Sequence, residues 1–98
     1  PWGQQVWFTP DGRTTGPYFY GIFSSYMPDL NYHNPDVTKE MNKVTEYWLK
    51  NYGVAGYRLD AIRHLIEEGQ QQENTKGTHA WLRGWHRFYK SVRPDAFT

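Results

Sequence analysis

The segment that decides the fold is GVAGYRLDAIRH, residues 53–64. Within it, VAGYRL is too short for a helix and largely apolar, which is typical of a strand buried on both faces of a parallel sheet. The run ends on the carboxylate of Asp60, with Arg58 two residues before it and Arg63 three residues after it. A core strand gains nothing from an ionised carboxylate at its end, so this position indicates that the charge is used.

A helix is predicted immediately before this strand. Asn34 is a favourable N-cap residue and Pro35 suits the first helical position. Gly53 is placed to end the helix. The apolar residues predicted to share one face of this helix, from their spacing, are Val37, Met41, Val44, Trp48 and Tyr52.

A second helix is predicted after the strand, from about Thr78 to Val92, and Pro94 stops it. The connection IEEGQQQENTKG, residues 66–77, is polar and is predicted to be solvated. AFT, residues 96–98, is predicted to open another strand. The residues predicted to share one face of the second helix are Trp81, Trp85, Phe88 and Val92.

This order of elements indicates α/β architecture with a parallel sheet. One strand–helix unit cannot bury both faces of its own strand, so the chain is predicted to be a slice of a larger fold. Residues 1–32 differ, because they are expected to form loops and short strands. The turn-forming residues of TPDGRTTGPY, residues 9–18, support that expectation.

Composition excludes several classes of function. The chain has 98 residues, with eleven Lys and Arg against ten Asp and Glu, so it lacks the basic footprint of a nucleic-acid-binding protein. No apolar run approaches the roughly 20 residues that span a bilayer, and no signal peptide is recognisable, so a membrane partner is not expected. Cysteine is absent, which excludes thiolate and disulfide chemistry and leaves the compartment open. The many aromatic rings either pack in a core or stack on flat ligands such as sugars.

Asp60 lies at the carboxyl end of the predicted strand, where parallel α/β folds place their chemistry. Side chains alternate along a strand, so Arg58 is expected on the same side as Asp60, where it favours the ionised carboxylate. Such a carboxylate suits a nucleophile or an electrostatic stabiliser. The alternative is an ion pair that locks the strand to a neighbour. Arg63 and His64 begin the next loop, within reach of a polar ligand.

Two motifs resemble those of the α-amylase family of glycoside hydrolases. GYRLDAIRHL, residues 56–65, resembles the family's second conserved segment, G-F-R-x-D-x-x-K/R-H. MPDLNY, residues 27–32, resembles its short segment near the end of domain B, and its form is similar to a group intermediate between the oligo-1,6-glucosidase and neopullulanase branches. The resemblance implies a partial (β/α)8 TIM barrel. Residues 1–32 match the end of domain B, and residues 33–98 match helix 3, strand 4, helix 4 and the start of strand 5.

The resemblance also implies roles for individual residues. Asp60 matches the catalytic nucleophile, and Arg58 matches the arginine that holds the nucleophile ionised and oriented. Arg63 and His64 match a basic pair that contacts sugar on the leaving-group side. Asp29 and the backbone carbonyl of His64 match ligands of a structural calcium ion in many relatives, so calcium is the one cofactor expected.

The activity implied by the resemblance is hydrolysis or transfer of α-glucosidic bonds in α-glucans or malto-oligosaccharides, with retention of configuration. The family's acid/base glutamate would follow shortly after Thr98, so the chain is expected to be a fragment that is inactive alone. One alternative is a non-catalytic amylase-like domain that serves in binding or assembly, similar to the ectodomains of amino-acid transporter heavy chains. Another is a free-standing sugar-binding module.

Overall fold

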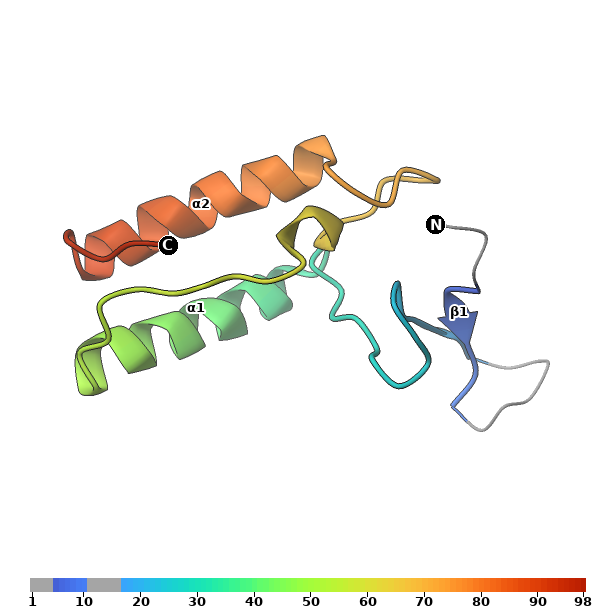
Figure 1. Cartoon of the computed structure of the whole chain (residues 1–98), viewed down its shortest axis with the longest axis horizontal. Coiled ribbons are helices and arrows are strands. Elements are labelled where there is room, and N and C mark those ends of the chain that lie inside the picture. The colour runs from blue at the N-terminus through green and yellow to red at the C-terminus, as the bar shows by residue number, and fades with distance from the viewer. Residues whose placement is uncertain (1–4, 11–16) are drawn as a thin grey trace. The chain divides into compact units, whose positions relative to one another are not determined.

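The computed structural model describes residues 5–10 and 17–98 of the chain. The chain forms two compact units, residues 1–30 and residues 31–98. The second unit holds both long helices and Asp60, and its helices are prominent in Figure 1. Within the described ranges, no helix is long and apolar enough to cross a membrane.

The first unit contains two short strands, β1 (Trp7–Phe8) and β2 (Phe19–Tyr20), which pair antiparallel. Trp7 lies opposite Tyr20 and their rings meet edge to face, with centroids 5.0 Å apart. Such cross-strand aromatic pairs stabilise a short ladder. The predicted loops and short strands are therefore confirmed for the described part of this region. Of the turn-rich stretch predicted at residues 9–18, residues 11–16 lie outside that part.

Helix α1 spans Pro35–Asn51 and begins where the sequence predicts. The side chain of Asn34 accepts a hydrogen bond from the backbone N–H of Asp36, at 2.9 Å, as an N-cap does. Gly53 follows the helix with a φ of +62°, in the left-handed region that favours glycine after a helix end. The predicted start and end of this helix are both confirmed.

The predicted apolar face of α1 is wrong in its second half. Val44, Trp48 and Tyr52 are exposed in this structure, whereas Thr45 and Leu49 are buried. The buried stripe is therefore displaced by one residue from the predicted one. The reason is that Thr45 supplies polar contacts to the rest of the unit, and apolar spacing carries no signal for such a residue.

Helix α2 spans Lys76–Val92 and starts two residues before the predicted position. The side chain of Thr75 caps it by accepting a hydrogen bond from the N–H of Thr78, at 3.0 Å. The helix ends before Pro94, as predicted. Its predicted apolar face is confirmed at Trp85, which is buried, and the half-buried members of that face are Trp81, Phe88 and Val92.

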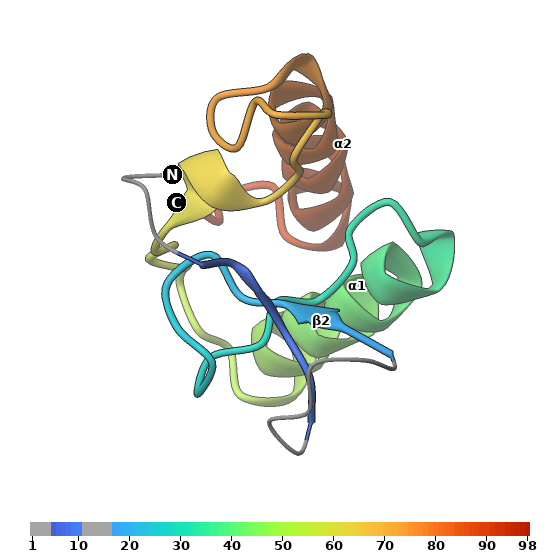
Figure 2. The same ribbon diagram turned by 90° about the vertical axis from the view of Figure 1, so that its right-hand side faces the viewer.

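Hydrogen bonds from indole groups of α2 to threonines of α1 join the two helices. Trp81 Nε1 donates to Thr38 Oγ1 at 2.8 Å, and Trp85 Nε1 donates to Thr45 Oγ1 at 3.0 Å. These contacts satisfy the N–H groups that large indole rings bring into a core. Figure 2 shows both helices on the same side of the extended segment that leads to Asp60. The buried core between these elements consists of Leu49, Trp85, Tyr89 and Ala96.

The predicted strand at residues 54–59 is an extended segment that forms a β-bridge at one position. Gly56 pairs with Phe97 in parallel, through hydrogen bonds from Tyr57 N to Phe97 O (2.9 Å) and from Phe97 N to the preceding residue's carbonyl, Ala55 O (3.2 Å). The predicted parallel pairing is thus confirmed at this position. One face of the segment is packed among the described residues: Tyr57 packs on the core, whereas Arg58 is exposed, which is compatible with a slice of a larger fold. A strand needs neighbours on both edges and a layer on each face, and the described residues supply one of each.

Gly56 allows the two segments to approach this closely, because a Cβ at that position would collide with the carbonyl of Phe97. We expect Gly56→Ala to lower the free energy of unfolding by about 1–3 kcal/mol, since the bridge must open to relieve the clash. Gly84 in α2 is the matched control, because a Cβ there meets only the far end of the Arg87 side chain, at 3.9 Å. Gly84→Ala should stabilise the protein by up to about 1 kcal/mol. Denaturant unfolding measures the free energy of unfolding of both variants. The same change in both would contradict the prediction.

Arg93 links the ends of the two helices. Its Nη1 donates to the carbonyls of Gly53 (2.9 Å) and Val54 (2.6 Å), and its Nε donates to Asp95 Oδ1 at 2.9 Å. The hydrogen bond and the charge of Arg93 lower the pKa of Asp95. A depressed carboxyl pKa means that this contribution to stability is present at neutral pH and is lost as the pH falls through the lowered pKa.

Candidate active site

Asp60 and Arg58 form a pair at the carboxyl end of the extended segment. Arg58 Nη1 lies 3.9 Å from Asp60 Oδ2, and both side chains are more than four-fifths exposed, at 84% and 83%. Tyr57 and Leu59 pack on the helix side instead, so the alternation predicted for this segment is observed. The second carboxylate oxygen, Oδ1, accepts a hydrogen bond from Ala61 N at 2.9 Å. The carboxylate is therefore held by its own backbone and faces away from the core.

The backbone turns sharply directly after Asp60. Ala61 has a φ of 54° and a ψ of 23°, in the left-handed region that residues with a Cβ adopt at a cost. The chain then forms a short 3₁₀ turn, Ile62–His64, in which His64 N donates to Ala61 O at 3.0 Å. Backbone strain of this kind is concentrated at functional sites. The turn at Ala61 leaves Asp60 as the last residue of the extended segment.

Arg58 and Asp60 line a cavity of about 250 Å³. Tyr32 is a further member, and its ring meets Trp81 edge to face, with centroids 5.1 Å apart. Partial burial raises the pKa of the Tyr32 hydroxyl. No role was predicted for Tyr32 from the sequence, although it ends the MPDLNY motif, which is the signal that could have identified it. The other lining residues include Met41, Val44, Tyr57, Leu59, Ile62, Leu65 and Leu82.

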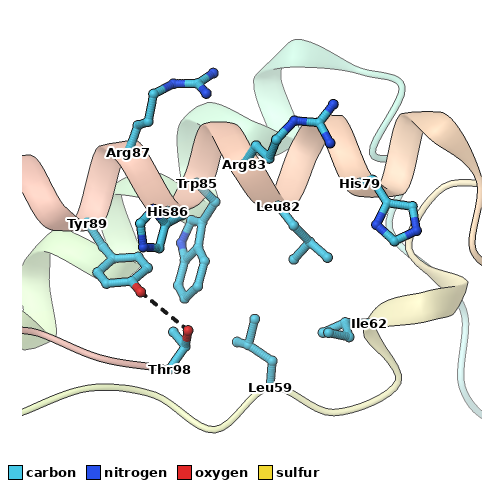
Figure 3. Close-up of a pocket in the computed structure, with 10 residues that line it drawn as sticks. All are labelled: Leu59, Ile62, His79, Leu82, Arg83, Trp85, His86, Arg87, Tyr89 and Thr98. Carbon is cyan, nitrogen blue, oxygen red and sulfur yellow. Dashed lines mark hydrogen bonds between the residues drawn. The ribbon is translucent and has the colours of Figure 1, made fainter.

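A larger cavity of about 520 Å³ lies between α2 and the segment that carries Leu59 and Ile62 (Figure 3). Figure 3 shows these two side chains facing α2. A hydrogen bond between Tyr89 Oη and Thr98 Oγ1, at 3.3 Å, lies at one end. No Asp or Glu is among the residues that line this cavity, so it offers no carboxylate for catalysis.

Arg63 and His64 both face Glu73, a residue of the connection that was predicted to be solvated. Its Oε2 lies 3.4 Å from Arg63 Nε and 3.9 Å from His64 Nε2. The His64 side chain is only 5% exposed, and its Nδ1 lies 3.3 Å from the carbonyl oxygen of Gln72. Because a carbonyl oxygen only accepts, Nδ1 carries the proton in this contact. The ring is thus enclosed by the following loop.

The prediction of a solvated connection at residues 66–77 was wrong in part. Ile66 is buried, its N–H donates to Thr78 Oγ1 (3.0 Å), and its carbonyl accepts from Thr75 Oγ1 (2.6 Å). Glu68 Oε1 accepts a hydrogen bond from Gly77 N at 2.7 Å, which suits a carboxylate at a helix N-terminus. Groups at the N-terminal end of α2 therefore also hydrogen-bond the loop that precedes the helix. The polar composition of this loop does not predict those contacts.

The predicted calcium ligands do not make up a site among the described residues. Asp29 Oδ2 accepts a hydrogen bond from Ile22 N at 3.3 Å, within the first unit. The structure brings together no group of three or more His, Cys, Asp or Glu side chains suited to a metal ion in the ranges it describes. Calcium takes six to eight oxygen ligands, so Asp29 and the carbonyl of His64 are too few. Calcium stays a prediction, and no chemical step depends on it.

Comparison with known proteins tests the family suggested by the motifs. Residues 2–98 match the model of the family described as alpha amylase, catalytic domain. Alpha-amylase 3 of Dictyoglomus thermophilum is 35% identical over 85 residues, which is 87% of this chain and 15% of the relative. The 4-alpha-glucanotransferase of Thermotoga neapolitana is 41% identical over 90 residues, which is 91% of this chain and 17% of the relative.

A third relative, the trehalose synthase of Pimelobacter sp., is 38% identical over 84 residues, covering 85% of this chain. The chain spans 14% of the length of that protein, and a similar share of the other two. The catalytic domain of this family is a (β/α)8 barrel, with which the helices and the parallel bridge of this α/β chain agree. The match over nearly the whole chain shows that it belongs to the α-amylase family.

Proposed function

We propose that this chain is part of a (β/α)8 catalytic domain that hydrolyses or transfers α-glucosidic bonds with retention of configuration. In this assignment α1, residues 53–60 and α2 are barrel helix 3, strand 4 and helix 4. Residues 96–98 open strand 5, and residues 1–32 are the end of domain B. The parallel bridge between Gly56 and Phe97 supports this order, because consecutive barrel strands pair in parallel.

The observation that carries the proposal is the placement of Asp60 beside Arg58. The carboxylate lies at the carboxyl end of the extended segment, 3.9 Å from the guanidinium, and it lines a cavity with aromatic walls. Barrel enzymes place catalytic residues at this end of their strands. A nearby cation keeps a carboxylate ionised, which a nucleophile requires. Aromatic side chains are suited to packing against sugar rings.

The proposed reaction proceeds in two steps. One oxygen of Asp60 attacks the anomeric carbon, and the bond from that carbon to the leaving oxygen breaks as a second carboxyl group protonates that oxygen. Water or a sugar hydroxyl then attacks the resulting glycosyl ester, transfers its proton to the second carboxylate and releases Asp60. Glu68 and Glu73 are engaged with Gly77 and with Arg63, respectively, so we assign the second carboxyl group to another part of the enzyme.

The proposed substrates are α-glucans or malto-oligosaccharides. The names of the relatives, an alpha-amylase and a 4-alpha-glucanotransferase among them, support this class. Arg63 is the basic residue proposed to contact the sugar on the leaving-group side, since its side chain is 62% exposed. His64 is enclosed, so we assign it to supporting that contact.

Covalent trapping tests the proposal directly. Incubation of the enzyme that contains this chain with 5-fluoro-α-glucosyl fluoride should add one fluoroglucosyl group, because fluorine slows release of the ester more than its formation. Peptide mapping by mass spectrometry should then locate the adduct on Asp60. The 98-residue chain alone should not be labelled, since it would hold only part of the proposed barrel that binds the sugar. No adduct on the enzyme, or an adduct on another residue, would refute the proposal.

A further inference from the structure

Glu73 lies between the two basic residues that follow Asp60. Its Oε2 approaches both Arg63 Nε (3.4 Å) and His64 Nε2 (3.9 Å), although Glu73 lies nine positions after His64 in the sequence. A single carboxylate oxygen therefore faces a flexible exposed arginine and an enclosed imidazole. This arrangement joins the two residues into one cluster.

Backbone contacts, rather than a chance meeting of long side chains, place Glu73 there. The next residue, Asn74, donates its N–H to Arg63 O at 2.7 Å and has a φ of +55°, which asparagine tolerates better than most residues. On the other side, Thr75 is fully buried and its hydroxyl donates to the carbonyl of Ile66. The loop before α2 is thus fastened along residues 63–66, and this holds Glu73 opposite Arg63.

The contact leaves most of the Arg63 guanidinium available for a ligand. A guanidinium carries five N–H donors, and four of them are on the two terminal nitrogens, beyond the Nε that Glu73 approaches. A free arginine side chain loses considerable rotamer freedom on binding, and a residue that restrains it beforehand reduces that loss. His64 provides a fixed support in this cluster, because Gln72 and Glu73 enclose its ring.

We infer that Glu73 is a positioning residue that orients Arg63 toward the sugar on the leaving-group side. The inference rests on the proposed function, in which Arg63 makes that contact. In this assignment Glu73 positions another residue rather than reacting itself, because its carboxylate faces Arg63 and His64. Its removal should therefore weaken recognition of a leaving sugar and spare the chemistry at Asp60.

Glu73→Gln tests this with two substrates that differ in their leaving group. A malto-oligosaccharide places a sugar beside Arg63, whereas α-glucosyl fluoride releases only fluoride. For the oligosaccharide we expect kcat/KM to fall about tenfold, mainly through KM, as is typical when the outer partner of a contacting group is removed. For α-glucosyl fluoride we expect kcat/KM to change by no more than about twofold, because this substrate has no leaving sugar that Arg63 could contact. An equal loss on both substrates, or no loss on the oligosaccharide, would overturn the inference.

Glu68→Gln is the matched control. The substitution removes the same charge from the same loop. In the unsubstituted protein the Glu68 carboxylate contacts Gly77 N at the start of α2 rather than Arg63. The variant should leave both substrates unaffected within about twofold, since a surface charge without that contact contributes little. If Glu68→Gln reproduced the selective loss, Glu73 would be acting through loop stability, and the inference would be wrong.

A second variant tests the same contact from the other partner. Arg63→Lys keeps the charge but removes Nε and the forked donors, so it should show the same selective loss on the oligosaccharide. Combining it with Glu73→Gln should add little, because residues that act as one unit are not additive. Additive losses would overturn the inference even if Glu73→Gln alone were recovered in poor yield. Failure of wild-type trapping at Asp60 would instead refute the proposed function itself.

Discussion

Asp60→Asn is expected to lower kcat/KM of the enzyme that contains this chain by about 10⁴-fold or more, as loss of a catalytic nucleophile does in other enzymes. The amide has nearly the same shape, but its oxygen cannot carry the bond to the anomeric carbon as a carboxylate does. The substitution also removes the negative charge that lies 3.9 Å from the Arg58 guanidinium. Steady-state kinetics on a malto-oligosaccharide measure the loss, and calorimetric titration with the same sugar should show that binding survives.

Asp36→Asn is the matched control for this variant. Asp36 is exposed in the first turn of α1, so the change removes a favourable interaction with the helix dipole and touches no part of the cavity. We expect unaltered turnover and a loss of stability of about 0.3–1 kcal/mol. Unchanged turnover in Asp60→Asn would refute its role as nucleophile. Loss of sugar binding and of thermal stability in Asp60→Asn would assign the residue a structural role instead.

Trp85→Ala is expected to lower the free energy of unfolding by about 3–5 kcal/mol, the range for removing a large aromatic side chain from a core. The ring is buried and contacts the rings of Tyr57, Trp81 and Tyr89, with centroids 5.9, 6.3 and 4.7 Å away. Its indole N–H also joins α2 to Thr45 of α1. Denaturant unfolding of the enzyme, followed by far-UV circular dichroism, measures the effect.

Two further variants separate packing from hydrogen bonding at this position. Trp85→Phe keeps much of the ring and loses the N–H that donates to Thr45, so the expected cost is smaller, about 1–3 kcal/mol. Arg87→Ala, on the exposed side of the same helix, should change stability by no more than about 0.5 kcal/mol. If Trp85→Ala were as stable as Arg87→Ala, the assignment of the core between α1 and α2 would be contradicted.

Local signals in the sequence predicted both ends of α1 and the C-terminal end of α2 correctly. Asn34 caps α1 through its own side chain, Gly53 follows α1 in a left-handed conformation, and Pro94 follows the end of α2. Each of these residues acts on backbone within a few positions of itself. The placement of Arg58 and Asp60 on one side of an extended segment was predictable for the same reason, because alternation is a property of the local backbone.

Contacts between segments distant in sequence could not be predicted in this way. Thr45 is buried because Trp85, forty residues later, needs an acceptor for its indole N–H. Glu73 faces Arg63 because the loop before α2 is fastened back along the chain. Neither residue stands out by hydropathy, since threonine and glutamate are ordinary surface residues.

The sequence by itself determined the family of this protein, both ends of α1, the end of α2 and the carboxylate at the end of the extended segment. Those features depend on motifs and on backbone preferences that act over a few residues. The tertiary structure alone decided which face of α1 is buried, which loop encloses His64 and which carboxylate holds Arg63. Such choices depend on which partners meet across the fold, because a side chain's burial and pairing are set by its neighbours in space.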